Sequence, residues 1–258
     1  MWCKIASEFY TIYQFPLCLG AIDGKHIRIR KPNKSGSKYF NYKGYFSIVL
    51  LAVTDANGQF VLVDVGFCGG NSDGGVFNRS TFKKRLYNDL LAIPKKGRIP
   101  GTEIELPFVF VADDAFPLGE HITKPFAQRQ LTDTKSILIT DCLEQGTVSN
   151  VHLGDWLDAQ MWRILHRQID EQPINVTNIV KAITVLHNFV IMNEPHRLTV
   201  TITDEEQQQP VVHDAINSGR NGPTKDALQT REMLMNYFNS PNGSLPWQNS
   251  KCFINSND

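Results

Sequence analysis

The stretch GAIDGKHI, residues 20–27, ends an apolar run on a carboxylate, Asp23. A second stretch, VFVADDAF at residues 109–116, ends another apolar run on Asp113. Short apolar runs of this kind are typical of β-strands, which hold the residues at their ends rigidly. Two carboxylates that converge from neighbouring strands repel each other unless a cation lies between them, and a hard divalent metal ion is the usual solution. The two stretches therefore predict adjacent strands that carry a metal site.

An Asp-Gly pair alone also occurs in ordinary turns, but the residues that follow Asp23 indicate an anionic ligand. Aromatic residues are interleaved with cations between Lys25 and Lys43, and no acidic residue occurs there, although the formal net charge of the chain is zero (+0). Cations and aromatic rings together suit a nucleic-acid backbone and unstacked bases. The candidate DNA-binding residues are Lys25, Arg28, Arg30, Lys31, Lys34, Lys38 and Lys43.

The order of the expected elements indicates an α/β class fold with an RNase H-like mixed sheet. Strands are predicted over residues 19–30, 46–55 and 59–66, then a helix over 77–91 and a buried strand over 107–112 that ends at Asp113. A hairpin turn joins the second and third strands. Further helices are predicted over residues 5–13, over 176–192 with Asn175 as the cap, and over 225–238.

The domain organisation follows from these elements and from a change in composition near residue 193. Residues 1–18 are expected to be an N-terminal helix remnant and 19–192 the RNase H-like domain. Residues 193–258 are expected to be a polar tail with a short helix near 225–238, since residues 199–222 are polar and have little apolar content. A chain of 258 residues with 41% hydrophobic content can bury one sizeable core.

Composition also excludes several classes of protein. No stretch approaches the roughly 18 consecutive apolar residues of a membrane span, and no signal peptide is recognisable, so a soluble intracellular protein without a membrane partner is expected. The five cysteines form no CxxC pair. That pattern predicts neither a zinc knuckle nor a disulfide framework.

Several short motifs follow one another along the chain: IDGKHI at 22–27, YFNYKGYFS at 39–47, SDGGVF at 72–77, DDAFPL at 113–118, LHNF at 186–189 and YFNSP at 237–241. In this order they resemble the PIF/Harbinger transposase-derived nucleases, a branch of the DDE endonuclease superfamily. The resemblance covers residues 15–248 and implies an RNase H-like fold. It also implies metal-dependent DNA cleavage by two aspartates and one glutamate.

The resemblance assigns roles to particular residues. Asp23 matches the first acid and Asp113 the second, and they would hold two divalent ions, Mg²⁺ or Mn²⁺, with Asp23 bridging them. Asp114 is interpreted as a neighbour rather than a ligand. Asp73 is expected to cap the helix that starts near residue 75, and His26 is expected to have a structural role.

The third acid is missing from the place where the family has it. Residues 139–156 read ITDCLEQGTVSNVHLGDW, which matches nothing in the family and lacks helical periodicity. Codons permitted for residues 138–156 can be chosen so that another reading frame encodes NYRLSRARHSVECPFGRL, which restores the family segment and its Glu. We therefore hypothesise a shifted reading frame, which the nucleotide sequence of the transcript would test. Glu144, Asp155 and Asp158 are the acids that remain nearby, and none has motif support.

The predicted function is a metal-dependent DNA endonuclease of the nucleus, or also of the cytoplasm, whose cleavage is weakened by the missing acid. Family members usually place a DNA-reading region before the catalytic domain, so a separate DNA-binding partner protein is expected to supply target recognition. The alternative is a non-catalytic DNA-associated or interaction protein, which the missing Glu favours. A two-carboxylate glycosidase is a further alternative in which the basic residues have no role.

Overall fold

The computed structural model describes residues 1–124, 126, 160–194 and 222–244, and the structural statements below concern these residues. Their centre is a five-stranded sheet in the order β3-β2-β1-β6-β7. The first three strands pair antiparallel, whereas β1–β6 and β6–β7 pair parallel. This is the order expected of an RNase H-like sheet, which confirms the predicted α/β fold class. The strands are β1 (Cys18–Arg28), β2 (Ser47–Thr54), β3 (Phe60–Cys68), β6 (Val109–Ala112) and β7 (Ile122–Thr123).

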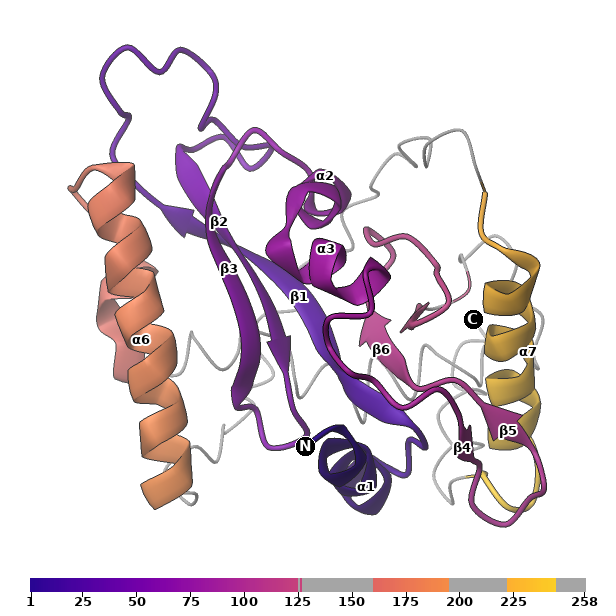
Figure 1. Cartoon of the computed structure of the whole chain (residues 1–258). Helices are drawn as coiled ribbons and strands as arrows, with labels where there is room; N and C mark the ends of the chain where they lie inside the picture. Colours follow the sequence, from indigo (N-terminus) through magenta and orange to yellow (C-terminus); the bar gives the residue numbers. More distant parts are fainter. Residues whose placement is uncertain (125, 127–159, 195–221, 245–258) are drawn as a thin grey trace, which may run out of the picture.

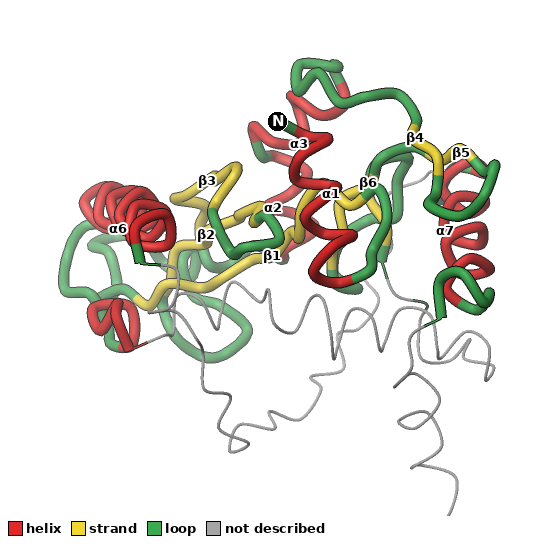
Figure 2. Tube along the Cα trace, turned by 90° about the horizontal axis from the view of Figure 1, so that it is seen from below, coloured by secondary structure: helices red, strands yellow, loops and turns green. Residues whose placement is uncertain are grey.

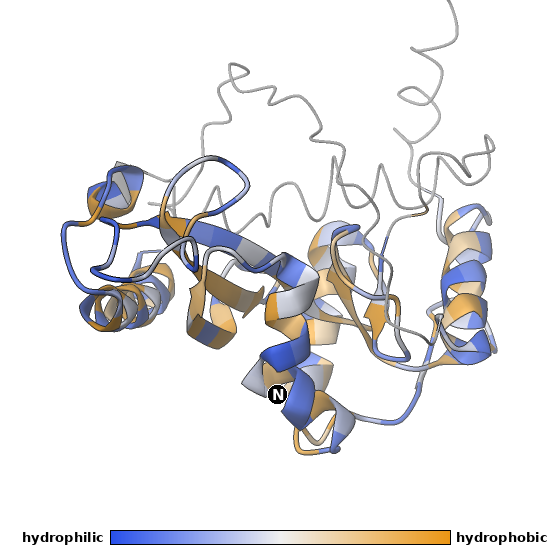
Figure 3. Ribbon diagram, turned by 90° about the horizontal axis from the view of Figure 1, so that it is seen from above, coloured by the Kyte–Doolittle hydropathy of each residue, from blue (hydrophilic) through white to orange (hydrophobic). Residues whose placement is uncertain are grey.

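Helices cover both faces of this sheet, and α6 and α7 lie at opposite ends of the molecule (Figures 1 and 2). A small second sheet pairs β4 with β5. Helices and strands carry most of the hydrophobic residues, whereas the connecting loops are mostly hydrophilic (Figure 3). The remaining elements are α1 (Trp2–Tyr13), α2 (Asp73–Arg79), α3 (Thr81–Tyr87), β4 (Gly97–Arg98), β5 (Glu105–Leu106), a 3-10 helix (Gln160–His166), α6 (Pro173–Asn193) and α7 (Lys225–Phe238).

Every residue of β2 is buried. Because alternate residues of a strand point in opposite directions, β2 is covered on both faces. Val49 and Leu51 pack in the same cluster as Phe77 of α2. Ile48 belongs to a second cluster, with Val180 of α6. The sheet therefore separates two cores, and α6 covers the face opposite to α2.

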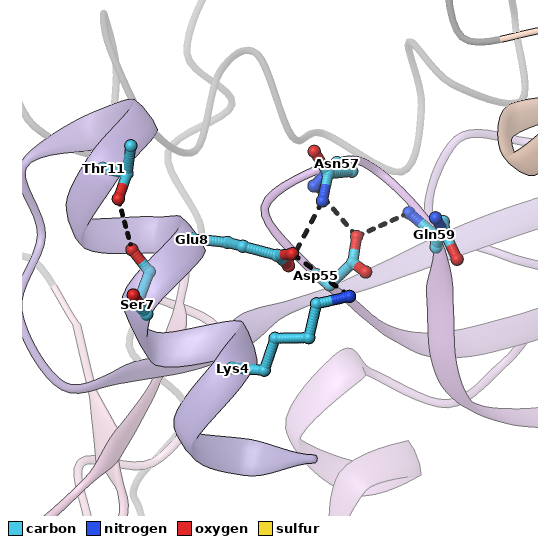
Figure 4. Close-up of polar contacts among 7 residues, drawn as sticks. All are labelled: Lys4, Ser7, Glu8, Thr11, Asp55, Asn57 and Gln59. Carbon is cyan, nitrogen blue, oxygen red and sulfur yellow. Dashed lines mark hydrogen bonds and ion pairs between the residues drawn. The ribbon is translucent and has the colours of Figure 1, made fainter.

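The N-terminal helix α1 packs against β1 and reaches the turn between β2 and β3 (Figure 4). In that turn the Asp55 carboxylate accepts hydrogen bonds from the backbone N–H groups of Asn57 and Gln59, both at 2.9 Å. The Asn57 side chain donates to Glu8 of α1 at 3.3 Å. The turn predicted from the sequence is thus tied to the first helix.

The single helix predicted over residues 77–91 is wrong, because the chain forms two short helices with a break at Ser80. The backbone of Ser80 is extended, with φ −65° and ψ 152°. Its hydroxyl donates to the carbonyl of Phe77 at 2.7 Å and accepts from the N–H of Lys83 at 2.9 Å. Ser80 therefore caps α3, and this local bonding competes with helix continuation.

The start of α6 also differs from the prediction. Asn175 lies inside the first turn, whereas the N-cap is Gln172 and Pro173 occupies the first helical position. Proline suits that position because its missing N–H would have no partner within the helix.

The apolar periodicity of this helix predicts a buried face made of Ile179, Val180, Ile183, Leu186 and Val190, and the buried face of α6 in the structure is rotated relative to it. Leu186, expected in the core, is 51% exposed, and His187 is buried in its place. His187 Nε2 lies 3.1 Å from the carbonyl oxygen of Gly58, so it is a partnered core histidine. Among the described residues, α6 is the one helix long and apolar enough to cross a membrane, but core helices pass the same test, and α6 packs on β3.

Candidate metal centre

The two predicted acids lie next to each other in the sheet. Ile22 of β1 aligns with Ala112 of β6 in the parallel register, and Asp23 and Asp113 are the residues that follow them. Neighbouring strands are about 4.8 Å apart, so two residues in this register start from adjacent backbone positions. Both side chains are half-buried.

Local hydrogen bonds orient each of these carboxylates. Asp113 Oδ1 accepts from the backbone N–H of Ala115 at 2.9 Å, in the turn that ends β6. Asp23 Oδ1 accepts from the backbone N–H of Gly24 at 2.6 Å. The strand β6 ends at Ala112 whereas β1 continues to Arg28, so the carboxylates lie where the pairing of the two strands stops.

A third carboxylate, that of Asp73, comes to the same place. We expected Asp73 to cap α2, and this is wrong, because Ser72 is the cap and its hydroxyl accepts from the N–H of Gly75 at 3.2 Å. Asp73 instead places Oδ1 over the backbone of Gly24. A Cβ added to Gly24 would lie only 2.5 Å from this oxygen. This oxygen is buried and has no hydrogen-bond partner.

The charges of the three acids interact. Burial, and then the nearby charges of Asp113 and Asp23, raise the pKa of the Asp73 carboxyl to about 7 from an ordinary 3.8, while Lys43 acts in the opposite direction. Carboxylates of like charge that share a site cannot all ionise without cost. The arrangement therefore favours either a proton or a cation at Asp73.

Two glycines permit this convergence, and both follow an aspartate in the sequence. Gly24 leaves the space that the Asp73 carboxylate occupies. A Cβ on Gly74 would lie 2.9 Å from the carbonyl oxygen of Ala115, so the start of α2 packs directly on the turn after Asp113. The repeated Asp-Gly pair was the sequence signal that could have identified Asp73 as part of the site.

A tyrosine and a lysine from the loop between β1 and β2 lie beside the acids. The pKa of the Tyr42 hydroxyl is raised by burial and then by the charge of Asp73, followed by smaller contributions that include Asp113 and Asp23. Lys43 is close enough to lower the pKa of Asp73, and its ammonium lies 5.7 Å from the centre of the Tyr42 ring. Lys43 is therefore the basic loop residue that the structure brings to the carboxylates.

A buried polar network supports this loop. His26 Nδ1 lies 2.8 Å from Ser47 Oγ, which also accepts from the Asn41 side chain at 3.0 Å. Burial, and then the charge of Lys43, lower the pKa of His26 to about 4, so its ring is neutral at neutral pH. The N–H of Tyr45 donates to the Asn41 side chain at 3.2 Å. His26 thus has the structural role expected from the sequence.

The remaining candidate cations are mostly exposed, and several lie over aromatic rings. The loop of residues 29–46 extends beyond the sheet at the upper left of Figure 1. Arg28 lies 5.3 Å from the ring of Tyr45, and Lys31 lies 5.5 Å from that of Phe46. Arg30 instead forms an exposed ion pair with Asp170 at 3.0 Å. The rest of the set is half-buried Lys25, and exposed Lys34 and Lys38.

Other acids have different positions. Asp114 is exposed and pairs with Lys124 at 3.0 Å. Glu144, Asp155 and Asp158 lie outside the described residues, as does the whole segment 138–156.

The donor set suits a hard divalent cation. Carboxylate oxygens are the ligands that Mg²⁺ and Mn²⁺ prefer. Within the part of the chain that the structure describes, no group of three His, Cys, Asp or Glu side chains stands in metal-ligand geometry. The partnerless Asp73 Oδ1, together with the adjacent Asp23 and Asp113, nevertheless fits such an ion in charge and in chemistry.

Comparison with known proteins gives a consistent result. A family described as DDE superfamily endonuclease matches residues 22–188. The chain is 31% identical over 83 residues to the Rattus norvegicus protein "Putative nuclease HARBI1". The matched residues are 32% of this chain and 24% of that protein. The chain is also 26% identical over 204 residues to "Protein ALP1-like" of Arabidopsis thaliana. These residues are 76% of this chain and 48% of that protein.

The chain therefore spans about half or less of the length of these relatives. No solved structure matches it. The family match confirms the resemblance on which the residue assignments rest, although it ends before the motif at residues 237–241.

Proposed function

Because the chain belongs to the DDE superfamily endonuclease family, we propose that it is a divalent-metal-dependent DNA endonuclease related to the Harbinger transposases. The observation that carries the proposal is the parallel register of β1 and β6, which sets Asp23 and Asp113 side by side. The nuclease names of the HARBI1 relatives support phosphodiester cleavage as the reaction.

The residues of the site have separate tasks. Asp23 and Asp113 would hold Mg²⁺ or Mn²⁺, and the backbone N–H of Ala115 keeps the Asp113 carboxylate in place. A bound ion of this kind would supply Lewis-acid polarisation of the phosphodiester and a lowered pKa for an attacking water. Lys43 and Lys25 neutralise phosphate charge beside the acids.

The substrate is DNA, bound by the basic loop of residues 29–46. Lysine and arginine neutralise phosphates, and exposed aromatic rings stack on unpaired bases. Phe40 is 45% exposed and Tyr42 is 57% exposed, so their rings are accessible for stacking. Target recognition comes from a separate DNA-binding partner protein, and the protein acts in the nucleus.

A second candidate function is a non-catalytic DNA-associated protein. The observation that favours it lies in the sequence, because residues 139–156 contain no counterpart of the family's third acid. In that case the same loop binds DNA and no strand is cut.

Nicking of supercoiled plasmid DNA distinguishes the two functions. We expect nicking by the purified chain with Mg²⁺ or Mn²⁺, none with EDTA, and none by Asp23→Asn, because removing one carboxylate charge weakens the metal site. Asp114→Asn is the matched control, since Asp114 is exposed and paired with Lys124.

The outcomes are separable. If the protein slows the migration of DNA in a gel but does not nick it with either Mg²⁺ or Mn²⁺, the non-catalytic function is selected. Equal nicking by the wild type and Asp23→Asn would contradict the assignment of Asp23.

A further inference from the structure

We propose that the outer face of α6 binds α6 of a second copy of this chain in an antiparallel pair. The interface is the apolar stripe, which we define as the exposed residues Ala182, Val185, Leu186, Phe189 and Met192. The proposal goes beyond the DNA endonuclease activity and does not depend on it.

The opposite face of α6 already accounts for the packing of this helix on the sheet. Val180 and Ile183 are buried in a cluster with residues of β2, and α6 contacts β3 as well. The apolar stripe faces away from the sheet, since Val185 is 68% exposed, Phe189 64% and Met192 70%. Only 39% of the most apolar 18-residue window of α6 is buried. The helix, which lies along one edge of the described structure (Figure 1), therefore carries apolar residues that the sheet does not cover.

The spacing of the apolar stripe is that of a seam between two helices. Ala182, Val185, Phe189 and Met192 follow one another at intervals of three, four and three residues. This alternation repeats every seven residues and sets the side chains in one line, as in coiled coils. A line of this kind fits a helix with the same spacing, and a second copy of the chain provides one.

The area of the apolar stripe is sufficient for a specific contact. Its four larger side chains are between 51% and 70% exposed. With Ala182 they expose on the order of 500 Å², which is within the range of functional apolar patches. Two copies would therefore bury about 1,000 Å², the area that separates a specific interface from most crystal contacts. This is the lower end of the range, so the dimer should dissociate on dilution.

Charge favours the antiparallel orientation. Among residues 173–193, all of which the structure describes, Lys181 is the one exposed charged residue, and it lies beside the apolar stripe. With the twofold axis at the middle of the stripe, near residue 187, the two Lys181 positions are about 18 Å apart along the helices. A parallel pair would bring these like charges to the same level. The dipoles of antiparallel helices also attract each other.

The same axis gives a register in which large side chains meet smaller ones. Val185 of each copy faces Phe189 of the other, and Ala182 faces Met192. Facing pairs of unequal size let two helices interdigitate without voids.

A lipid surface fits the apolar stripe less well. Helices that lie on membranes carry many lysines and arginines on their polar face. Helix α6 has one exposed cation, Lys181, and its opposite face is packed on the sheet.

The test is sedimentation velocity of the purified chain over a range of protein concentrations, with EDTA and without DNA. We expect a monomer–dimer equilibrium. Val185→Glu and Phe189→Lys should each raise the dimer dissociation constant at least about tenfold, because each would bury a charge in an apolar interface. The matched control is Leu90→Lys, which should associate as the wild type does, since Leu90 is 62% exposed but follows α3, away from the stripe.

Mixing the two variants tests the register. In the antiparallel pair the introduced carboxylate and ammonium face each other across the axis, so the mixture of Val185→Glu with Phe189→Lys should associate more tightly than either variant alone. Association of the mixture that is no stronger would overturn the antiparallel register. Circular dichroism verifies the fold of each variant, and Met192→Lys replaces any variant that does not fold.

The remaining outcomes would overturn the proposal. A dimer that none of the stripe substitutions weakens uses another surface. A wild type that stays monomeric at every concentration has no such interface, and a urea midpoint that Val185→Glu lowers in that monomer would show that other residues of the chain cover the stripe. A monomer that binds phosphatidylcholine–phosphatidylglycerol vesicles, with binding lost in Val185→Glu, would identify a lipid surface as the occupant.

Discussion

Burial, and then repulsion from Asp113 and Asp23, raise the pKa of the Asp73 carboxyl in the folded protein. The free energy of unfolding therefore depends on pH. An acid whose pKa is raised on folding binds its proton more tightly in the folded state. Its contribution to stability is therefore full below the ordinary pKa of 3.8 and is lost as the pH rises through about 7. One pKa unit corresponds to about 1.4 kcal/mol, so the loss is at most about 4 kcal/mol.

We predict that Asp73→Asn removes this pH dependence from the metal-free protein. The free energy of unfolding of the wild type, measured by urea denaturation with EDTA, should fall between about pH 4.5 and about pH 7.5, and that of Asp73→Asn should fall much less. The asparagine stays neutral throughout this range. Parallel curves for the two proteins would show that Asp73 does not carry the shifted titration.

At the level of single residues, the sequence predicted Asp23 and Asp113 because each ends an apolar run that must be a strand. Asp73 was assigned to the wrong task because Ser72 and Asp73 are both good helix caps. Which of them takes the cap depends on the backbone angle at Ser72, whose ψ is 158°. With Ser72 as the cap, the Asp73 side chain lies against Gly24 of β1, a contact that no local pattern contains.

The start of α2 packs against Gly24 of β1 and against Ala115 after β6, and Gly74 determines how closely it approaches Ala115. We predict that Gly74→Ala lowers the free energy of unfolding by about 1–3 kcal/mol, as is typical of overpacking, because the added Cβ would lie 2.9 Å from a backbone oxygen. Urea denaturation measures this change.

Gly75→Ala is the matched control in the same helix. Its Cβ would meet the Ser72 hydroxyl at 3.2 Å, a side-chain contact that can adjust. Alanine also favours helix, so the change should stay within about 1 kcal/mol. Equal destabilisation by both substitutions would contradict the assignment of the cost to the contact with Ala115.

Element types were predictable where apolar periodicity was strong, as in β1 to β3 and β6. The boundaries of the elements and the buried faces of the helices were less predictable. The break at Ser80 depends on side-chain bonds to Phe77 and Lys83, which compete with the helix. The buried face of α6 includes His187 because the carbonyl of Gly58 accepts its hydrogen bond, so a polar residue displaced Leu186 from the core.

The formal net charge of the whole chain is +0, but the charged residues are unevenly distributed along it. The basic loop extends from the ends of β1 and β2 (Figure 1), and its Lys43 acts on the charge of Asp73. The sequence predicted a cation near the acids, because the basic residues follow Asp23 directly in the chain. Because the chain is neutral overall, the proposed binding of DNA would depend on this local surface rather than on the net charge.

We predict that DNA binding falls steeply with salt and that the slope depends on the loop lysines. The logarithm of the association constant should change by about 0.9 per phosphate contact for each unit of log salt. Replacing Lys31, Lys34 and Lys38 together with glutamine should therefore reduce the slope by up to about 2.7 for duplex DNA. The control, Lys95→Gln with Lys96→Gln, removes two exposed cations next to β4 and should leave the slope unchanged. Fluorescence anisotropy of labelled DNA at several salt concentrations measures the slopes, and an unchanged slope in the triple variant would place the DNA on another surface.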